Sequence, residues 1–293
     1  MKNIRGKVAV VTGAGSGIGR SIALGLANEG VHLALCDLDL ENLKNTKEAC
    51  SALNVQVFAG RVDVANVDAM RSFAKEVKIR LGQVDIVINN AGVALIMDAR
   101  ESNRHAAQKV FGVNFWGVVN GCEAFMPFLV DRPEAHIVNV ASVFGLVGLA
   151  SQSTYCASKA AVRGYTESLA ADLKGTNISL TTVIPGGVRT NIVRNSVALP
   201  SSKNAPFNRE LAARNFEKIA ASTPEYAARL IIKGIKRKRS RVLIGADAKI
   251  IDLIVRLMPM SGPKFLNFVF GFMQVRGEKE ATKSQMTETL DAV

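Results

Sequence analysis

The stretch that decides the fold is "VTGAGSGIGRSIALGLANEG", residues 11–30. It follows an apolar run of strand length and continues into a segment with helical periodicity. Gly13, Gly17 and Gly19 lie at the turn between them, where glycines let the backbone turn tightly and approach a pyrophosphate. The first N–H groups of the helix add partial positive charge for the phosphates. A glycine triplet alone also fits a tight turn without a ligand, so other positions must decide.

The composition is that of a globular chain. With 48% hydrophobic residues and 8 prolines in 293 residues, the chain can bury a sizeable core. The four cysteines form no CxxC pair and have no nearby histidine pattern, so we expect neither a metal site nor a disulfide framework. The apolar run before Thr12 is too short for a secretory signal, and we interpret it as a strand. These features predict a cytoplasmic protein.

Apolar runs alternate with amphipathic stretches through the first 190 residues. Helix-length stretches at 39–53, 66–81 and 104–130 separate several of the runs. This alternation predicts an α/β protein with a doubly wound parallel sheet, the Rossmann fold. The candidate strands are "KVAVVTG" (7–13), "HLALCD" (32–37), "VQVFAGRVD" (55–63), "DIVINNA" (85–91), "HIVNVAS" (136–142) and "ISLTTVIP" (178–185).

No linker composition appears before the candidate loop at 195–208. This continuity favours one domain over residues 1–245, followed by a C-terminal helical extension, basic and apolar, over 246–293.

Asp37 strengthens the nucleotide interpretation. It ends the second candidate strand, eighteen residues after Gly19, where a carboxylate can accept hydrogen bonds from both adenine-ribose hydroxyls. Its charge would repel a 2′-phosphate, and Ser16 in the glycine loop supplies no basic group, so we expect NAD rather than NADP. The alternative is that Asp37 is a turn or helix-capping residue, a role that Asp39 could also fill.

Two further strand ends contribute to the same crevice, because ligands of open α/β sheets bind outside the carboxyl ends of the strands. Asp63, in "RVDV" (61–64), could accept a hydrogen bond from the adenine amino group. In "NNAG" (89–92), small residues would let the backbone lie flat against the cofactor. The alternatives are a helix cap at Asp63 and an ordinary turn at 89–92.

The sequence "STYCASKAA" (153–161) places Tyr155 and Lys159 on one face of a predicted helix, a turn apart. Lowering the pKa of a phenol by about three units takes about 4 kcal/mol of preferential stabilisation of the phenolate. A cation in a partly desolvated cleft can supply this. We therefore expect Lys159 to lower the pKa of Tyr155 and make it a proton acceptor near neutral pH.

Two other polar residues complete the candidate set. Ser142 closes "HIVNVAS" at the same sheet edge, where its hydroxyl could hold a substrate oxygen beside Tyr155. Asn114 lies in a long helix predicted to be buried, where an unpaired amide is costly. We expect its partner to be a water molecule or a backbone group that also contacts Lys159.

Together, "TGAGSGIG", "NNAG", Asn114, Ser142, "YCASK" and "PGGVRT" resemble the short-chain dehydrogenase/reductase family in order and spacing. The resemblance is to its compact branch and covers residues 5 to about 245. The Tyr-to-Lys spacing of four argues against the enoyl-reductase branch. The resemblance implies an NAD(P)-dependent alcohol dehydrogenase or ketone reductase, which moves hydride between the nicotinamide and a carbinol or carbonyl carbon.

The resemblance also implies roles for individual residues. Tyr155 is the general base in oxidation and the acid in reduction, and Lys159 lowers its pKa and binds the nicotinamide ribose. Ser142 orients the substrate oxygen, and Asn114 holds the water of a proton relay. The expected cofactor contacts are Gly13, Ser16, Gly17, Ile18, Gly19, Asp37, Asp63, Val64, Asn90, Ala91, Gly92, Tyr155, Lys159, Pro185, Gly186, Val188 and Thr190.

The substrate is expected to be a hydrophobic secondary alcohol or its ketone. Residues 189–222 are predicted to form a lid whose amphipathic part carries Leu211, Phe216 and Ile219. The expected substrate pocket is lined by Val93, Ser142, Val143, Phe144, Leu149 and Tyr155.

The C-terminal third carries most of the positive charge. Of the net charge of +12, residues 201–293 hold +8, with 17 Lys/Arg against 9 Asp/Glu. Six basic residues at 233–241 precede the short strand "RVLIG" and two apolar stretches, each shorter than the roughly 20 residues of a membrane span. Three interpretations remain open: burial in a homodimer or homotetramer, peripheral contact of 246–273 with the inner face of an anionic membrane, and a solvated basic face.

A different class of function would be a nucleotide sensor or nucleic-acid-binding protein that keeps the fold. The basic cluster could bind phosphates non-specifically. No recognition-helix or stacking-aromatic motif accompanies it, and aromatic residues are 6% of the chain. A sensor would also not need Ser142, Tyr155 and Lys159 together, so we expect nucleic acid not to be a partner.

Overall fold

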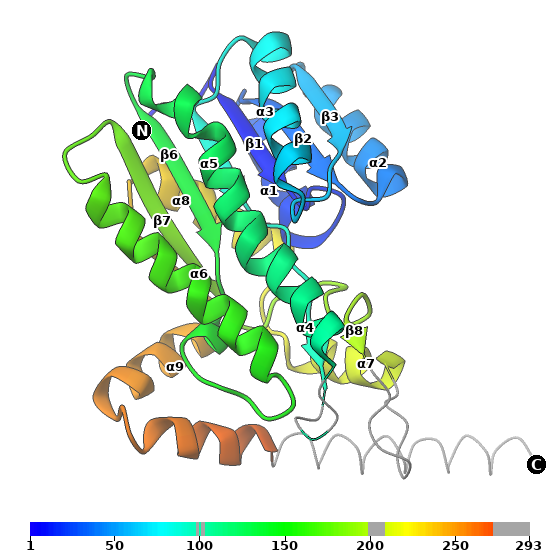
Figure 1. Ribbon diagram of the computed structural model, residues 1–293, viewed down its shortest axis with the longest axis vertical. Helices are drawn as coiled ribbons and strands as arrows, with labels where there is room; N and C mark the ends of the chain where they lie inside the picture. Colours follow the sequence, from blue (N-terminus) through cyan, green and yellow to red (C-terminus); the bar gives the residue numbers. More distant parts are fainter. Residues whose placement is uncertain (98–99, 101–102, 199–208, 272–293) are drawn as a thin grey trace, which may run out of the picture.

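The structure is a computed structural model that describes residues 1–97, 100, 103–198 and 209–271. Its centre is a seven-stranded sheet in the order β3-β2-β1-β4-β6-β7-β9, with every neighbouring pair parallel. Helices cover both faces (Figure 1). The predicted doubly wound α/β fold is thereby confirmed.

Each predicted strand is present. The strands are β1 (Val8–Thr12), β2 (His32–Asp37), β3 (Val57–Arg61), β4 (Ile86–Asn89), β6 (Ala135–Val140), β7 (Ile178–Pro185) and β9 (Arg241–Ile244). Alternate residues of a strand point to opposite faces. Val10 of β1 therefore packs in one hydrophobic core, while its neighbours Ala9 and Val11 pack in the other. Burial on both faces explains why inner strands such as β1 and β4 read as continuous apolar runs, whereas the edge strand β3 is only half-buried.

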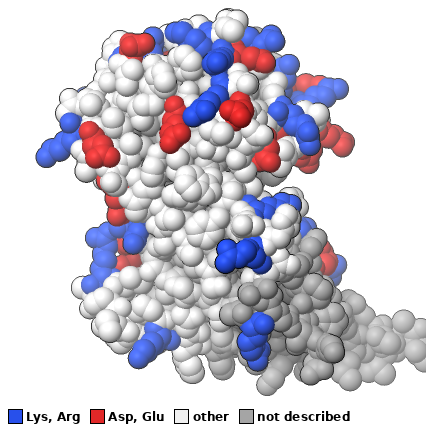
Figure 2. Space-filling view, in the orientation of Figure 1, with Lys and Arg blue, Asp and Glu red and all other residues white. Residues whose placement is uncertain are grey.

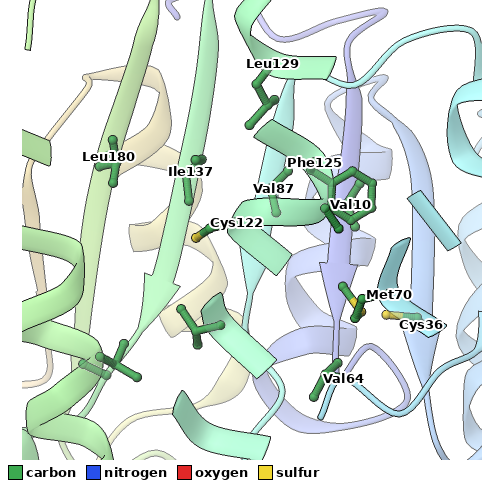
Figure 3. Close-up of a cluster of buried hydrophobic side chains, with 14 of the residues drawn as sticks. Val10, Cys36, Val64, Met70, Val87, Cys122, Phe125, Leu129, Ile137 and Leu180 are labelled. Atoms are coloured by element: carbon green, nitrogen blue, oxygen red, sulfur yellow. The ribbon is translucent and has the colours of Figure 1, made fainter. Parts of the chain in front are cut away.

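One face is covered by α3 (Val67–Leu81), α5 (Gly117–Val130) and α6 (Ser153–Asp172). Phe125 of α5 is fully buried at its centre, above Val10 and Val87 of the sheet (Figure 3). The other face carries α1 (Gly17–Asn28), α2 (Leu40–Ser51) and α8 (Pro224–Lys236), whose inward residues include Leu26 and Ile231. Two cores therefore hold the sheet from both sides.

The strand order reverses between β1 and β4. From β1 the chain runs outward through β2 and β3, then returns to β4 on the other side of β1. A crevice opens at such a switch point, outside the carboxyl ends of the strands. The glycine loop after β1 and the "NNAG" segment after β4 both lie there.

The predicted helix at 104–130 is interrupted. It consists of α4 (Arg104–Phe111), a π-helical turn η2 (Gly112–Trp116) and α5. A π turn inserts one residue into the helical repeat, and such turns are frequent at functional sites. Asn114 lies in this turn and is fully buried. Periodicity did not predict the interruption, because the apolar pattern continues across it.

Beyond the sheet edge lie the segments predicted as lid and extension. A short parallel pair joins β5 (Leu95–Ile96) to β8 (Val197–Ala198), and α7 (Arg209–Ile219) follows in the chain. The predicted loop at 195–208 lies largely outside the described residues. The extension forms α9 (Ala246–Leu257) and a second helix at 262–271, drawn in orange in Figure 1. Within the described part of the chain, no helix is long and apolar enough to cross a membrane.

Candidate active site

The glycine loop fits a pyrophosphate. Gly13 has φ +66°, and a Cβ there would lie 2.8 Å from the Cα of Ala91. A Cβ at Gly19 would lie 2.0 Å from the carbonyl oxygen of Gly13, so only glycine allows this turn. Ser16 is the N-cap of α1, but its side chain makes no capping hydrogen bond. The side chain leaves the N–H groups of the first turn for another acceptor, and an anion suits that position.

Thr12 ties the glycine loop to the "NNAG" segment. Its buried hydroxyl accepts hydrogen bonds from the backbone N–H groups of Asn90 and Ala91, both at 3.0 Å. The Asn90 side chain donates back to the carbonyl oxygens of Thr12 (3.0 Å) and Gly13 (3.2 Å). The sequence analysis assigned no role to Thr12. The available signal was the position of Thr12, which ends a buried strand and directly precedes the first glycine of the loop.

Asp37 faces the glycine loop. Its Oδ2 accepts from the Gly15 N–H at 2.8 Å, and its Oδ1 accepts from the Asp39 N–H at 3.1 Å. Asp39, not Asp37, is the N-cap of α2, where its side chain accepts from the Asn42 N–H. The capping alternative for Asp37 is therefore wrong. Each of its oxygens keeps a further lone pair for hydroxyl donors.

The other adenine-side residues come from the loop after β3. Asp63 is exposed, and its Oδ1 accepts from the Ala65 N–H at 3.0 Å. The cap of α3 is Asn66, so the capping alternative for Asp63 is also wrong. Val64 is buried, and its carbonyl oxygen accepts from the Asn120 side chain at 2.8 Å. Asn120 thus fixes this loop against α5.

The "PGGVRT" segment lies next to the glycine loop. Pro185 ends β7, and a Cβ at Gly17 would lie 3.1 Å from Cγ2 of Thr190. Gly186 bonds to the Ile244 carbonyl (2.9 Å), and Val188 forms an isolated bridge with Ser222. The structure therefore brings together two groups of residues expected to contact the cofactor: the glycine loop after β1 and the "PGGVRT" segment at the end of β7.

Asp247 holds this segment, and the sequence analysis did not assign it a role. Its Oδ2 accepts from the Gly187 N–H at 2.6 Å, and its buried Oδ1 has no partner within the described structure. A Cβ at Gly186 would lie 2.1 Å from the same carboxylate. The contact joins residues sixty positions apart, so no local pattern could have predicted it.

Tyr155, Ser142 and Phe144 converge beyond the carboxyl end of β6. Ser142 caps the short η3 turn (Val143–Gly145), where its hydroxyl accepts from the Phe144 N–H at 3.1 Å. It is also near enough to the Tyr155 phenol to affect its pKa. The rings of Phe144 and Tyr155 meet edge to face, with centroids 6.5 Å apart. Burial raises the pKa of Tyr155 to about 12, although the nearby Ser142 hydroxyl lowers it. The expected lowering of this pKa is thus not produced by the polypeptide alone.

Lys159 is buried one turn after Tyr155. Its Nζ donates to the Val140 carbonyl oxygen at 2.9 Å, and a Cβ at Gly92 would lie 3.3 Å from Nζ. Burial lowers the pKa of Lys159 to about 8. The ammonium therefore lies between the ends of β4 and β6. The pKa of Lys159 is lowered by desolvation alone, and pairing with the Tyr155 phenol does not contribute.

Asn114 has protein partners on both amide atoms. Its Oδ1 accepts from the Val93 N–H (2.8 Å), and its Nδ2 donates to the Val93 carbonyl oxygen (2.9 Å) and the Ser158 hydroxyl (3.1 Å). The expected partner was a water molecule or a backbone group that also contacts Lys159. The backbone group present is that of Val93, whereas Lys159 donates to the Val140 carbonyl oxygen. Since a Cβ at Gly92 would lie 3.3 Å from both the Asn114 oxygen and Lys159 Nζ, the two side chains border the same glycine.

The predicted substrate residues are only partly brought together. Val93 and Leu149 are half-buried, Val143 is buried in the core under α6, and Phe144 contacts Tyr155. Phe270, in the extension, meets Phe144 edge to face at 5.9 Å. In the predicted lid, Ile219 is 57% exposed. The Leu211 side chain lies outside the described residues.

Comparisons with known proteins agree with this geometry. Residues 7–199 match the short chain dehydrogenase family. The putative oxidoreductase SadH of Mycobacterium tuberculosis is 39% identical over 264 residues, which are 89% of this chain and 94% of that protein. Estradiol 17-beta-dehydrogenase 11 of Macaca fascicularis is 28% identical over 88% of this chain and 81% of that protein.

A solved structure is also similar. The crystal structure of a short chain dehydrogenase/reductase from Burkholderia phymatum in complex with NAD has a TM-score of 0.80 and 34% identity, covering 89% of this chain and 95% of that one. The family match, the relatives and the shared fold all extend over the glycine loop and the Tyr155 region. The chain therefore belongs to the short-chain dehydrogenase family.

Proposed function

We propose that this chain, an oxidoreductase as a member of the short-chain dehydrogenase family, interconverts a hydrophobic secondary alcohol and its ketone. It would use NAD, with Tyr155 as general acid and base. The observation that carries the proposal is the convergence of Ser142, Phe144 and Tyr155 at the same sheet edge as the glycine loop, with the buried Lys159 one turn after Tyr155. This places a proton donor and acceptor next to a dinucleotide crevice.

The chain's residues divide into binding and proton-handling groups. The glycine loop and the first turn of α1 would bind the pyrophosphate, and the "PGGVRT" segment would orient the nicotinamide end. When bound, NAD supplies the hydride acceptor at the nicotinamide ring and a positive charge beside the site. Ser142 would hold the substrate oxygen at hydrogen-bonding distance from Tyr155, where the proton is given or taken.

The titration of Tyr155 favours different roles in the two directions. Since its pKa is raised to about 12, the phenol is protonated at neutral pH and can donate to a developing alkoxide during ketone reduction. In alcohol oxidation the phenol must lose its proton, which requires extra positive charge near its oxygen. Lys159 would supply this charge. With the cofactor bound, its ammonium would donate to a ribose hydroxyl in place of the Val140 carbonyl oxygen and would stay beside Tyr155.

The preference for NAD rests on Asp37. Its carboxylate lies beside Gly15, at the end of β2, and would meet a 2′-phosphate with like charge. The Burkholderia phymatum structure binds NAD, which supports the same choice here. We therefore expect substitution of Asp37 by serine to raise the activity with NADP relative to that with NAD.

The preference for an apolar substrate rests on the rings around Tyr155. Phe144 contacts Tyr155 directly, and Phe270 extends the aromatic surface away from the site. Apolar and aromatic linings with a few placed polar groups are typical of small-molecule sites. Estradiol, which the name of one relative gives as its substrate, is a hydrophobic secondary alcohol.

The experiment is a panel of secondary alcohols and ketones, from short aliphatic to steroid size, assayed with NAD(H) and NADP(H). We expect kcat/KM to rise with apolar size and to be higher with NAD(H). A strong preference for small charged substrates would overturn the proposed substrate class. Tight, strongly salt-dependent binding to duplex DNA without turnover would instead support the nucleic-acid alternative.

The structure gives that alternative little support. In the basic run, Lys236 pairs with Glu29 at 2.8 Å, Lys238 with Glu134 at 2.7 Å and Arg241 with Asp252 at 2.5 Å. Charges engaged by carboxylates offer less attraction to a phosphate backbone. Half of the run is therefore neutralised within the chain.

A further inference from the structure

Exposed apolar side chains are concentrated in the C-terminal extension. Thirteen large hydrophobic residues are exposed in the described structure, and seven of them fall between residues 250 and 268. Scattered single residues of this kind need no explanation, but a contiguous group marks an interaction site. We call this group the C-terminal face: Ile250, Leu253, Leu257, Met258, Met260, Phe265 and Phe268.

Helical spacing separates this face from the core. In α9, Ala248 and Ile251 are buried, while Ile250, Leu253 and Leu257 are 57%, 57% and 72% exposed. The outward residues follow the i, i+3, i+7 pattern of one helix stripe. An ordinary surface helix carries polar residues on that stripe, so α9 has two apolar sides, of which the core covers one.

The next helix repeats the arrangement. Leu266 is buried and Phe270 packs against the core, whereas Phe265 and Phe268 are 53% and 74% exposed. The connection between the helices contributes Met260, which is 84% exposed. Two helices and their connection thus present apolar side chains outward together.

The charges around the face are positive. Lys249, Arg256 and Lys264 are exposed. The acidic residues within 246–271 are Asp247, which binds the Gly187 N–H, and Asp252, which pairs with Arg241 and Arg256. In Figure 2 the described atoms at the bottom of the molecule, where both helices lie, are white and blue, whereas red side chains are spread over the upper part.

We propose that the C-terminal face docks on the surface of an anionic lipid bilayer. Lys and Arg beside Leu, Ile and Phe are the composition of helices that lie in the interface plane. Negatively charged headgroups attract such basic residues, and the apolar side chains enter the boundary with the acyl chains. The proposal stands independently of the proposed reaction, because it rests only on this surface.

A second copy of the chain is a poorer occupant. A two-fold interface through this face would bring Lys249 and Lys264 of both copies together. No exposed acidic residue of the described extension is there to pair with them. Like charges brought together in this way oppose association.

Docking would place the active site beside the bilayer. Phe270 contacts Phe144, which contacts Tyr155, and the Asn267 side chain donates to the Gly148 carbonyl oxygen at 2.7 Å. The second helix therefore borders the loop that carries Ser142. A lipophilic substrate could pass from the bilayer to this loop without crossing water.

The test is co-sedimentation of the full-length protein with vesicles of phosphatidylcholine alone or mixed with phosphatidylglycerol. We expect sedimentation with the mixed vesicles and roughly 25-fold weaker partition into the neutral ones, because Lys249 and Lys264 should each contribute about fivefold. Replacing either lysine by glutamine should therefore weaken partition into the mixed vesicles about fivefold. The double variant Phe265→Ser/Phe268→Ser should lose at least about tenfold.

Controls separate this proposal from its alternatives. Ile79→Ser removes a residue that is 81% exposed on α3, and partition should not change. Removal of residues 274–293 should also leave partition unchanged. If the shortened protein no longer partitions into the vesicles, that segment carries the binding and the proposal is overturned. Wild-type protein that stays in the supernatant with mixed vesicles would overturn it as well. So would a double phenylalanine variant that partitions like wild type but dissociates an oligomer in sedimentation velocity, since a second copy would then cover the face.

Discussion

At the residue scale, burial controls the pKa values of both Tyr155 and Lys159. Desolvation disfavours the charged form of each, so it raises the pKa of Tyr155 and lowers that of Lys159. Their spacing on one helix face could be predicted from the sequence. The direction of the Tyr155 shift could not, because it depends on how much of the phenol the surrounding chain removes from water.

Lys159 should make stability depend on pH. Its pKa is lowered from 10.5 to about 8, so the folded state binds fewer protons than the unfolded state between these values, and stability rises as the pH increases through them. Between pH 7 and 9.5 this contributes about 2 kcal/mol to the free energy of unfolding. Burial raises the pKa of the Cys36, Cys50 and Cys122 thiols, which lowers stability over the same range, but equally in wild type and in Lys159→Met. In urea unfolding, the change in stability from pH 7 to pH 9.5 should therefore be about 2 kcal/mol more positive in wild type than in Lys159→Met; equal changes in the two proteins would contradict the assignment.

Asp247 should position the nicotinamide end of the cofactor site. Asp247→Ala removes the acceptor of the Gly187 N–H, and hydrogen bonds to charged groups contribute about 1.5 to 3 kcal/mol. We expect the KM for NAD to rise about tenfold or more, and Asp247→Asn, which keeps an acceptor oxygen, to restore most of the loss. A purely structural role would instead lower the free energy of unfolding in both variants and leave the KM unchanged.

At the element scale, the elements with long apolar runs were predictable and the short ones were not. All seven strands of the main sheet follow from short apolar runs in the sequence. The two-residue strands β5 and β8 have no pattern of their own, because they are defined by pairing across the chain. The π turn at 112–116 was missed for a related reason, since Asn114 within it bonds to Val93 and Ser158, which lie far from it in the chain.

The turn from β1 to α1 should tolerate no side chain at Gly19. A Cβ there would lie 2.0 Å from the Gly13 carbonyl oxygen and 2.6 Å from Asn90 Nδ2. We expect Gly19→Ala to lower the free energy of unfolding by about 1 to 3 kcal/mol and to weaken NAD binding measured by calorimetry. Gly164→Ala, in α6 with no atom near its Cβ, is the matched control and should be neutral or stabilising.

At the scale of the whole molecule, the extension is joined to the enzyme core. Ala248, Ile251 and Leu266 belong to the same hydrophobic cluster as Phe125 of α5. Through Asp247 and Phe270 the extension also reaches the cofactor segment and the Phe144 ring. The sequence predicted its amphipathic character, but these contacts required the three-dimensional structure, because they join residues far apart in the chain.

Stability should therefore depend on the extension. Ile251 is 5% exposed, and its replacement by alanine should cost about 2 to 5 kcal/mol in the free energy of unfolding. Ile250→Ala, at the 57% exposed neighbouring position, should cost little. Denaturant unfolding of the two variants checks this, and similar small losses would show that the helix is not part of the core.

The most direct test of the central claim is alcohol oxidation and ketone reduction by wild type and Tyr155→Phe, with NAD affinity measured on both. If Tyr155 transfers the proton, the phenylalanine variant should lose about 100-fold or more in kcat. Its affinity for NAD should stay close to that of wild type, because the ring remains and only the hydroxyl is removed. Turnover by Tyr155→Phe at the wild-type rate would contradict the account.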